Sequence, residues 1–242
     1  QNYAWGQDCW SDFEGTMKAK LPAAAVTTSQ MPKLFAGQYG TEISALLAAK
    51  PDVIHSSFWD GDLEALILQA APRGLFKKST VILTAGETAI HKLGNAIPDG
   101  TVIGARGPHS VFAPDTEINR WFQKTYRDRF NTPPNYASYH MVQAILGAKT
   151  AYEKAKAAAG GADPTQEQII AAFEGLTYES ASGKVEMRNS KGHQAIQETA
   201  YGTTKMVKGQ LTVTNVKRYP ADMVNPPEGV KSADWIASGF KR

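Results

Sequence analysis

Three short segments of the chain together offer large aromatic side chains and two carboxylates, two side-chain types suited to holding a small organic molecule. They are Tyr3-Ala4-Trp5-Gly6, Phe58-Trp59-Asp60 and Gly86-Glu87. Aromatic faces cover an apolar or planar ligand or attract a cation, and a carboxylate holds an ammonium or amide group. The second and third segments come directly after predicted strands, and we expect the first segment, which also carries large aromatic side chains, to follow a strand in the same way. In a doubly wound sheet the ligand lies at the carboxyl ends of the strands, so this recurrence favours a binding cleft.

Each of these side chains also has a purely structural interpretation. Trp5 and Phe58 would then pack at the edge of a hydrophobic core. Asp60 would cap the helix that follows it, and Glu87 would complement the dipole of a helix in its first turn. The sequence leaves both interpretations open for each residue taken singly.

The patterns of common catalytic and metal sites are absent from the sequence. The histidines, which are His55, His91, His109, His140 and His193, form no metal-binding spacing. There is no Gly-x-Ser-x-Gly nucleophile motif, and the glycines form neither a phosphate loop nor a dinucleotide fingerprint. Cys9 is the single cysteine, so it cannot form an internal disulfide, and we expect it to pack as a small hydrophobe. We therefore expect no metal, no cofactor and no catalytic centre.

In the first half of the chain, helical and strand patterns alternate. Apolar residues at helical spacing predict helices around residues 10–17 (ending at Leu21-Pro22), 43–47 and 63–70, and apolar runs predict strands over residues 24–29, 52–57 and 80–84. Strands separated by helices of this length are typical of a parallel, doubly wound α/β sheet.

From about Gly104 the pattern changes. Three helices are predicted nearly in succession: one around residues 118–130, one over 135–159, and one that opens at Asp163-Pro164-Thr165 with a capping box between Thr165 and Gln168. Only strands follow, over residues 184–188, 200–207 and 211–218, with Lys208-Gly209 as a hairpin turn. The tail from Ala221 is predicted to be an irregular strap. The change predicts a chain with two lobes.

Composition narrows the class of protein. The 242 residues are 42% hydrophobic and 20% charged, and 26 basic against 23 acidic residues give a formal charge of +3. No run of like charges exceeds two residues, which argues against a nucleic-acid partner. The longest apolar stretch, residues 63–71, is broken by Glu64 and Gln69 and is far shorter than the roughly 20 residues that span a bilayer. No basic or apolar leader segment follows Gln1.

Taken together, the chain resembles the branched-chain amino acid (leucine-isoleucine-valine) type of periplasmic substrate-binding protein, which delivers ligands to ABC transporters. Members of this group also take amides, urea and aromatic acids. The resemblance covers almost the whole chain and is carried by residues 3–7, 51–54 with Phe58-Trp59, 86–87, 131–139 and 193–195. It implies an α/β fold of the type I periplasmic binding protein class, with two doubly wound parallel-sheet lobes that close on the ligand about a hinge.

The resemblance assigns roles to several residues. Trp5, together with Phe58 or Trp59, matches aromatic positions at the strand exits, and Glu87 matches the acidic residue that pairs with a ligand ammonium in amino-acid-binding members. It also implies a division of the chain: residues 1–105 as the βα units of lobe 2, residues 106–196 as the helical return into lobe 1, and residues 197–242 as the return strands to lobe 2 and the strap.

Members of this family are longer, and the equivalent of most of lobe 1 precedes Asn2 in them. We therefore expect the chain to be the C-terminal part of a longer protein, with the missing N-terminal portion as one partner and a membrane permease as another. A periplasmic or extracellular location follows. The alternatives are a ligand-sensing regulatory domain of the same fold or, third, a hydrolase in which Asp60 or Glu87 acts as a base.

Overall fold

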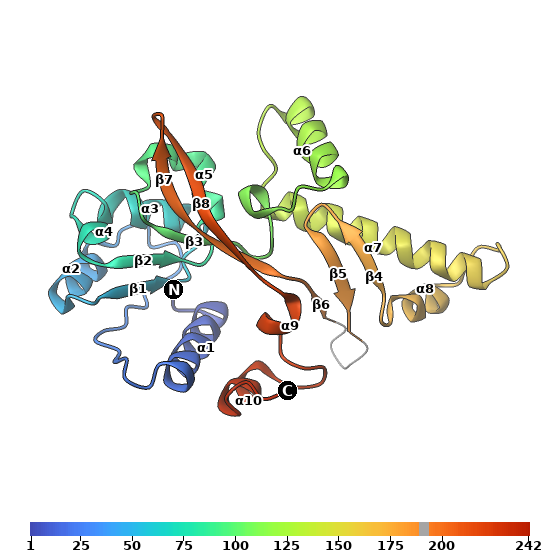
Figure 1. Ribbon diagram of the computed structural model, residues 1–242, viewed down its shortest axis with the longest axis horizontal. Helices are drawn as coiled ribbons and strands as arrows, with labels where there is room; N and C mark the ends of the chain where they lie inside the picture. The colour runs from blue at the N-terminus through green and yellow to red at the C-terminus, as the bar shows by residue number, and fades with distance from the viewer. Residues whose placement is uncertain (189–193) are drawn as a thin grey trace. The chain divides into compact units, whose positions relative to one another are not determined.

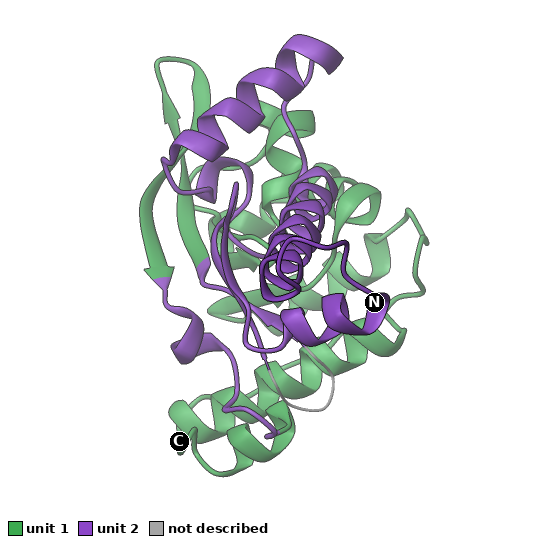
Figure 2. Cartoon of the chain, turned by 90° about the vertical axis from the view of Figure 1, so that its right-hand side faces the viewer, with its two compact units in different colours: residues 1–106, 200–218, 231–242 green, residues 107–199, 219–230 purple. Residues whose placement is uncertain are grey.

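The computed structural model describes residues 1–188 and 194–242, and the chain divides into two compact units (Figures 1 and 2). Unit 1 comprises residues 1–106, 200–218 and 231–242, and unit 2 comprises residues 107–199 and 219–230. His193, which carried part of the family resemblance, lies outside the described residues.

Unit 1 is built on a five-stranded mixed sheet with the strand order β1-β2-β3-β7-β8. Its strands are β1 (Val53–Ser56), β2 (Thr80–Leu83), β3 (Val102–Gly104), β7 (Thr199–Val207) and β8 (Gln210–Tyr219). β1, β2 and β3 are parallel, with Ile54 opposite Val81 and Ile82 opposite Val102, whereas β7 is antiparallel to β3. The predicted parallel βα arrangement is thus present in β1 to β3, and the returning hairpin makes the sheet mixed.

The helices of unit 1 surround this sheet. They are α1 (Ala4–Lys20), α2 (Gly40–Ala49), α3 (Asp60–Ala70), α4 (Leu75–Lys78), α5 (Glu87–Leu93), the 3₁₀ turn η1 (Gly94–Ala96) and α10 (Ser232–Ala237). The predicted helices over residues 10–17, 43–47 and 63–70 are confirmed as α1, α2 and α3. The core of the unit contains buried Ile43, Leu63, Ile67, Leu83 and Ile103.

Helix α1 packs against both α10 and the sheet. The ring of Phe13 stacks on that of His55 in β1 at 3.9 Å between centroids. Because successive strand residues point to opposite faces, Ile54 and Ser56 turn to the other side of the sheet, where they are buried. Cys9 lies half-buried on the same helix.

In unit 1 one sequence prediction is wrong, and one strand was not predicted. Residues 24–29 are mostly exposed and form no strand, because no neighbouring strand in the described residues supplies backbone hydrogen bonds to them. The short strand β3 was not predicted. The hairpin turn at Lys208-Gly209 is confirmed, and both residues have the positive φ angles, 49° and 80°, that a two-residue hairpin turn requires.

Unit 2 contains helices and a three-stranded antiparallel sheet in the order β4-β5-β6. Its elements are the 3₁₀ turn η2 (Ser110–Phe112), α6 (Glu117–Phe130), α7 (Tyr136–Ala158), α8 (Gln166–Phe173), β4 (Thr177–Ser180), β5 (Gly183–Met187), β6 (Ala195–Ile196) and α9 (Ala221–Val224). The predicted helices are confirmed, and α8 begins with the expected capping box. The tail is more regular than predicted, since it contains α9 and α10.

Two apolar clusters hold unit 2 together. One joins α7, α8 and the β4–β5 hairpin through residues such as Ala151, Leu176 and Val185. The other packs Phe122 of α6 on Tyr139 of α7 in an edge-to-face arrangement at 5.0 Å. Exposed apolar side chains remain on α7, among them Met141 and Ile145 one helical turn apart.

Candidate functional site at the strand exits

The carboxyl ends of β1, β2 and β3 meet at one edge of the sheet in unit 1, because the three strands are parallel. The segments that follow them deliver Trp59, Glu87 and Arg106 to this edge, and the start of α1 adds Tyr3. We call these four residues the strand-exit cluster. Its members come from four separate parts of the chain but contact one another in a series.

Tyr3 and Trp59 form the first link of the strand-exit cluster. The indole Nε1–H of Trp59 donates a hydrogen bond of 2.7 Å to the hydroxyl of Tyr3. Both side chains are half-buried. Burial raises the pKa of the Tyr3 phenol, so the hydroxyl stays protonated at neutral pH and keeps a proton to donate.

Arg106 links the indole to Glu87. The guanidinium carbon lies 5.7 Å from the centroid of the Trp59 ring, within the range of a cation–π contact. The Nε atom of Arg106 lies 3.6 Å from Oε1 of Glu87, which makes an ion pair longer than a hydrogen bond. The side chain of Arg106 is 22% exposed and that of Glu87 only 1%. The Nε and Nη2 atoms of Arg106 are buried, so the cation is only partly exposed, and the carboxylate of Glu87 is buried.

Glu87 occupies an unusual environment for a carboxylate. Neither of its oxygens has a hydrogen-bond partner within the described residues. Burial raises the pKa of Glu87 to about 7, and the nearby Arg106 charge offsets part of that rise. A carboxyl group with such a pKa changes its charge near neutral pH and is typical of a functional site. Glu87 also stands in the first turn of α5, so the dipole interaction expected from sequence is compatible with this position.

The structure separates the adjacent residues Phe58 and Trp59. Phe58 is 7% exposed and its ring packs edge-on against Tyr39 at 5.0 Å, so it belongs to the core. Trp59 follows in extended backbone and points the other way, into the strand-exit cluster. Phe58 thus lies in the core and Trp59 in the strand-exit cluster, and a role of either residue in ligand binding stays a prediction.

Asp60 and Trp5 lie beside the cluster rather than in it. Asp60 begins α3, its side chain is exposed, and its carboxylate pairs with Lys92 at 2.9 Å, which also pairs with Glu64. Trp5 lies in the first turn of α1, not in a loop, and its ring is 6.2 Å from that of Tyr3. Trp5 therefore extends the aromatic surface on the Tyr3 side.

Sequence reasoning missed two contributors. The sequence predicts Arg106 only as the start of the return into lobe 1, because the three-residue strand β3 that positions it was not predicted. Phe35, on the loop before α2, was not considered at all; its ring lies 6.2 Å from that of Trp59 in an edge-to-face arrangement. A signal for Arg106 existed, since it follows Val102–Gly104 as Glu87 follows β2.

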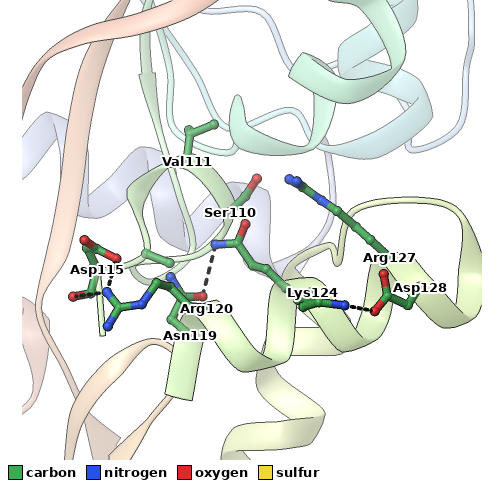
Figure 3. A pocket seen from close by; sticks show the side chains of 10 residues that line it. Ser110, Val111, Asp115, Asn119, Arg120, Lys124, Arg127 and Asp128 are labelled. Atoms are coloured by element: carbon green, nitrogen blue, oxygen red, sulfur yellow. Dashed lines mark hydrogen bonds and ion pairs between the residues drawn. The ribbon is translucent and has the colours of Figure 1, made fainter. Parts of the chain in front are cut away.

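Unit 2 has a polar depression of about 550 Å³ along α6 (Figure 3). Four of its charged side chains form two ion pairs, Arg120 with Asp115 and Lys124 with Asp128, and all four are well exposed; Arg127 also lines it. Such solvated pairs are weak and hold no ligand by themselves. Because none of the sequence-predicted site residues lines it, we regard it as surface relief.

Unit 2 also contains a buried pair of polar side chains, His109 and Ser182. Nδ1 of His109 lies 3.0 Å from Oγ of Ser182, but both residues are fully buried, so a substrate would not reach the hydroxyl. Within residues 1–188 and 194–242, no group of three or more potential ligands could hold a metal ion. In the same part of the chain, no helix is long and apolar enough to cross a membrane.

Several solved structures share this fold. A leucine-, isoleucine-, valine-, threonine- and alanine-binding protein from Brucella ovis matches with a TM-score of 0.71 and 20% identity over 94% of this chain and 58% of its own. An amino acid ABC transporter substrate-binding protein from Pseudomonas fluorescens Pf-5 gives 0.71 and 17% over 100% and 60%. An ABC transporter solute-binding protein from R. palustris, in complex with 4-hydroxybenzoate, gives 0.71 and 18% over 91% and 59%.

The chain thus spans about three fifths of the length of these structures. A comparison with curated protein sequences found no match. At these identities the structural likeness confirms the expected type I periplasmic binding fold. A family model described as periplasmic binding protein matches residues 1–209, which is most of the sequence, and the chain therefore belongs to the periplasmic binding protein family.

Proposed function

We propose that this chain supplies part of the ligand-binding cleft of an extracytoplasmic solute-binding protein that delivers a small organic molecule to an ABC transporter. The observation that carries the proposal is the strand-exit cluster. It combines aromatic surface with one partly exposed cation and one buried carboxyl group at the edge of the sheet where α/β proteins bind ligands.

The chemistry of the cluster defines the class of ligand. The faces of Trp59 and Tyr3, extended by Trp5, would take an apolar or aromatic part. Arg106, whose side chain is 22% exposed, would hold an anionic group such as a carboxylate. If the ligand is an amino acid or amine, Glu87 would face its ammonium and exchange its weak contact with Arg106 for a direct one. The ligands named for the structural relatives, branched-chain amino acids and 4-hydroxybenzoate, both fit this description.

The two units would then correspond to parts of the two lobes, with residues 1–105 and the hairpin of residues 199–219 in lobe 2 and residues 106–196 in lobe 1. The relatives are longer than this chain, and the portion that it does not match would supply the remaining wall of the cleft. A membrane permease would be the partner of the loaded protein, and the location would be periplasmic or extracellular. We propose no chemical conversion of the ligand.

Titration calorimetry on the protein in its full length tests the proposal. The probes are L-leucine and 4-hydroxybenzoate, and the recovered ligand is checked by mass spectrometry for absence of turnover. Burial of one aromatic side chain contributes about 1.5 to 3 kcal/mol, so Trp59→Ala and Trp5→Ala should each weaken binding about tenfold or more. Trp121→Ala, at an exposed tryptophan on α6, is the matched control. Unchanged affinity in both cluster variants, or binding of neither probe, would refute the proposal.

A second titration tests the role of Glu87. Glu87→Gln keeps the shape of the side chain and removes its charge, and a charge-assisted hydrogen bond is worth about 1.5 to 3 kcal/mol. Affinity for L-leucine should therefore fall about tenfold or more, whereas affinity for 4-hydroxybenzoate, which has no ammonium group, should change much less. An equal loss for both probes would show that Glu87 has a structural role only.

A further inference from the structure

Phe35 is a large apolar residue whose side chain is exposed to solvent. It is 72% exposed, the most exposed of the large hydrophobic side chains in the described part of the chain. It lies on the irregular segment between α1 and α2. Exposure of a single apolar residue is ordinary, but the backbone of Phe35 is not.

The backbone at Phe35 adopts a left-handed conformation, with φ of 58°. This region suits glycine and costs free energy for a residue with a bulky side chain, because Cβ approaches the following carbonyl oxygen. Gly37, two residues later, has a similar φ of 68° and no such cost. The strain at Phe35 therefore needs contacts that maintain it.

Those contacts come from α3. The buried carboxylate of Asp62 accepts a 2.8 Å hydrogen bond from the backbone N–H of Phe35 and another from the side-chain amide of Gln1. Further along the loop, the side chain of Gln69 on the same helix accepts a hydrogen bond from the backbone N–H of Tyr39 and donates one to the carbonyl of Gly37. The loop is thus fixed at several points to the helix that begins immediately after Trp59.

The result of this fixation is the position of the ring. The rings of Phe35 and Trp59 lie 6.2 Å apart at 70°, an edge-to-face pair with one ring exposed. The indole of Trp59 also donates a hydrogen bond to Tyr3 and contacts the guanidinium of Arg106. Phe35 and Trp59 therefore form an aromatic pair next to a cation, and Phe35 is the more exposed ring of the pair.

We propose that Phe35 is a specificity-determining residue of the strand-exit site, which packs on the apolar part of the ligand while Arg106 holds its anionic group. The inference deepens the proposed function and rests on it. It means that discrimination between large and small apolar groups comes from the loop before α2, a segment that no sequence motif marks. Asp62 is then a positioning residue, because it acts on the ligand only through the loop.

Paired probes with a common head group test this. L-leucine is compared with L-alanine, and 4-hydroxybenzoate with acetate, by calorimetry on the protein in its full length. Phe35→Ala should weaken binding of the larger member of the pair that binds by about tenfold and of the smaller member by less than twofold. Phe130→Ala, an exposed phenylalanine on α6, serves as the matched control and should change neither.

Phe35→Gly separates a ligand contact from a role in folding. Glycine accepts the left-handed backbone without strain, so this variant should melt at or above the wild-type temperature while losing the same discrimination as Phe35→Ala. Asp62→Asn should reduce discrimination in wild type and have no further effect on it in the Phe35→Ala background, since the ring it positions is gone.

The possible failures are distinct. Binding of no probe by the wild type overturns the proposed function and this inference together. Binding by the wild type with unchanged discrimination in Phe35→Ala, or with equal losses for both members of a pair, overturns the inference alone. A marked fall in the melting temperature of Phe35→Gly would show that the ring is a packing element and would also overturn it.

Discussion

The indole Nε1–H of Trp59 donates a 2.7 Å hydrogen bond to the hydroxyl of Tyr3 across 56 positions of sequence. The bond fastens the start of α1 to the exit of β1, and neither end belongs to the core. Trp59, a ligand contact expected from the sequence, is thus also part of a structural link. The geometry of this link depends on one hydroxyl group.

Tyr3→Phe should therefore lower stability by about 1 kcal/mol, because it removes the acceptor and leaves a half-buried indole N–H without a partner. Chemical denaturation followed by tryptophan fluorescence measures the change. Tyr152→Phe is the control: the Tyr152 hydroxyl bonds the carboxylate of Asp163 at an exposed position, and its loss should cost less than about 0.5 kcal/mol. Equal effects in the two variants would contradict the assignment.

Glu87 should make the chain less stable as the pH rises. Its pKa is about 7 in the folded state, above the ordinary value of 4.5, so the folded chain favours the protonated form. Its contribution is complete below pH 4.5 and is lost as the pH rises through 7, a loss of up to about 3 kcal/mol at 1.36 kcal/mol per pKa unit. Glu87→Gln cannot ionise, so its stability relative to wild type should increase from pH 4.5 to pH 8. A constant difference in denaturation free energy over that range would contradict this.

His55 should have the opposite dependence. Burial beneath Phe13 lowers its pKa to about 4 from 6.5, so the folded chain favours the neutral imidazole. The stability that this contributes is present above pH 6.5 and is lost as the pH falls from 6.5 toward 4, by up to about 3 kcal/mol. His55→Phe should remove that acid-side loss while keeping an aromatic stack on Phe13. Denaturation curves at pH 7.5 and 4.5 give the comparison.

The effects of Glu87 and His55 cancel in part between pH 4.5 and 6.5, so the wild-type profile alone hides both. Only the two single variants, measured in parallel, separate them. Identical pH profiles for the two variants would show that neither group titrates as its surroundings indicate.

The exposed apolar face of α7 should promote self-association. Met141 and Ile145 are 62% and 59% exposed and lie on the same side of the helix, where apolar contact with another molecule removes area from water. Sedimentation velocity should show species above 26.2 kDa that increase with concentration. Met141→Lys combined with Ile145→Lys should reduce them, and Lys149→Glu with Glu153→Lys, an exchange of neighbouring surface charges, should not. A monodisperse monomer at all concentrations would refute the prediction.

Local patterns predicted much of the fold because they act over few residues. The capping box at Thr165 and the hairpin at Lys208-Gly209 each need only neighbouring side chains and backbone, and both are confirmed. The failed strand at residues 24–29 shows the limit: β-branched residues favour extended backbone, but a strand exists only beside a partner that supplies hydrogen bonds. Nothing local to those residues says whether the partner is there.

The site was harder to predict for a related reason. The sequence identified Trp59 and Glu87 by their place after strands, and it could not choose between Phe58 and Trp59, which extended backbone sends in opposite directions. The contact between Glu87 and Arg106, and the approach of Phe35 to Trp59, depend on packing between distant segments. The roles of all these residues in binding stay predictions until ligand is titrated.

Cys9 offers a way to follow the packing of α1 without introducing a new reactive residue. It is the single thiol of the chain and is half-buried on α1, and burial raises its pKa above the ordinary value. Because only the thiolate is alkylated, reaction at neutral pH is slow unless α1 moves away from its neighbours. The alkylation rate therefore reports how often this helix detaches. A slower alkylation of Cys9 on adding a ligand would show that ligand binding at the strand exits makes α1, which follows Tyr3 and contains Trp5, detach less often.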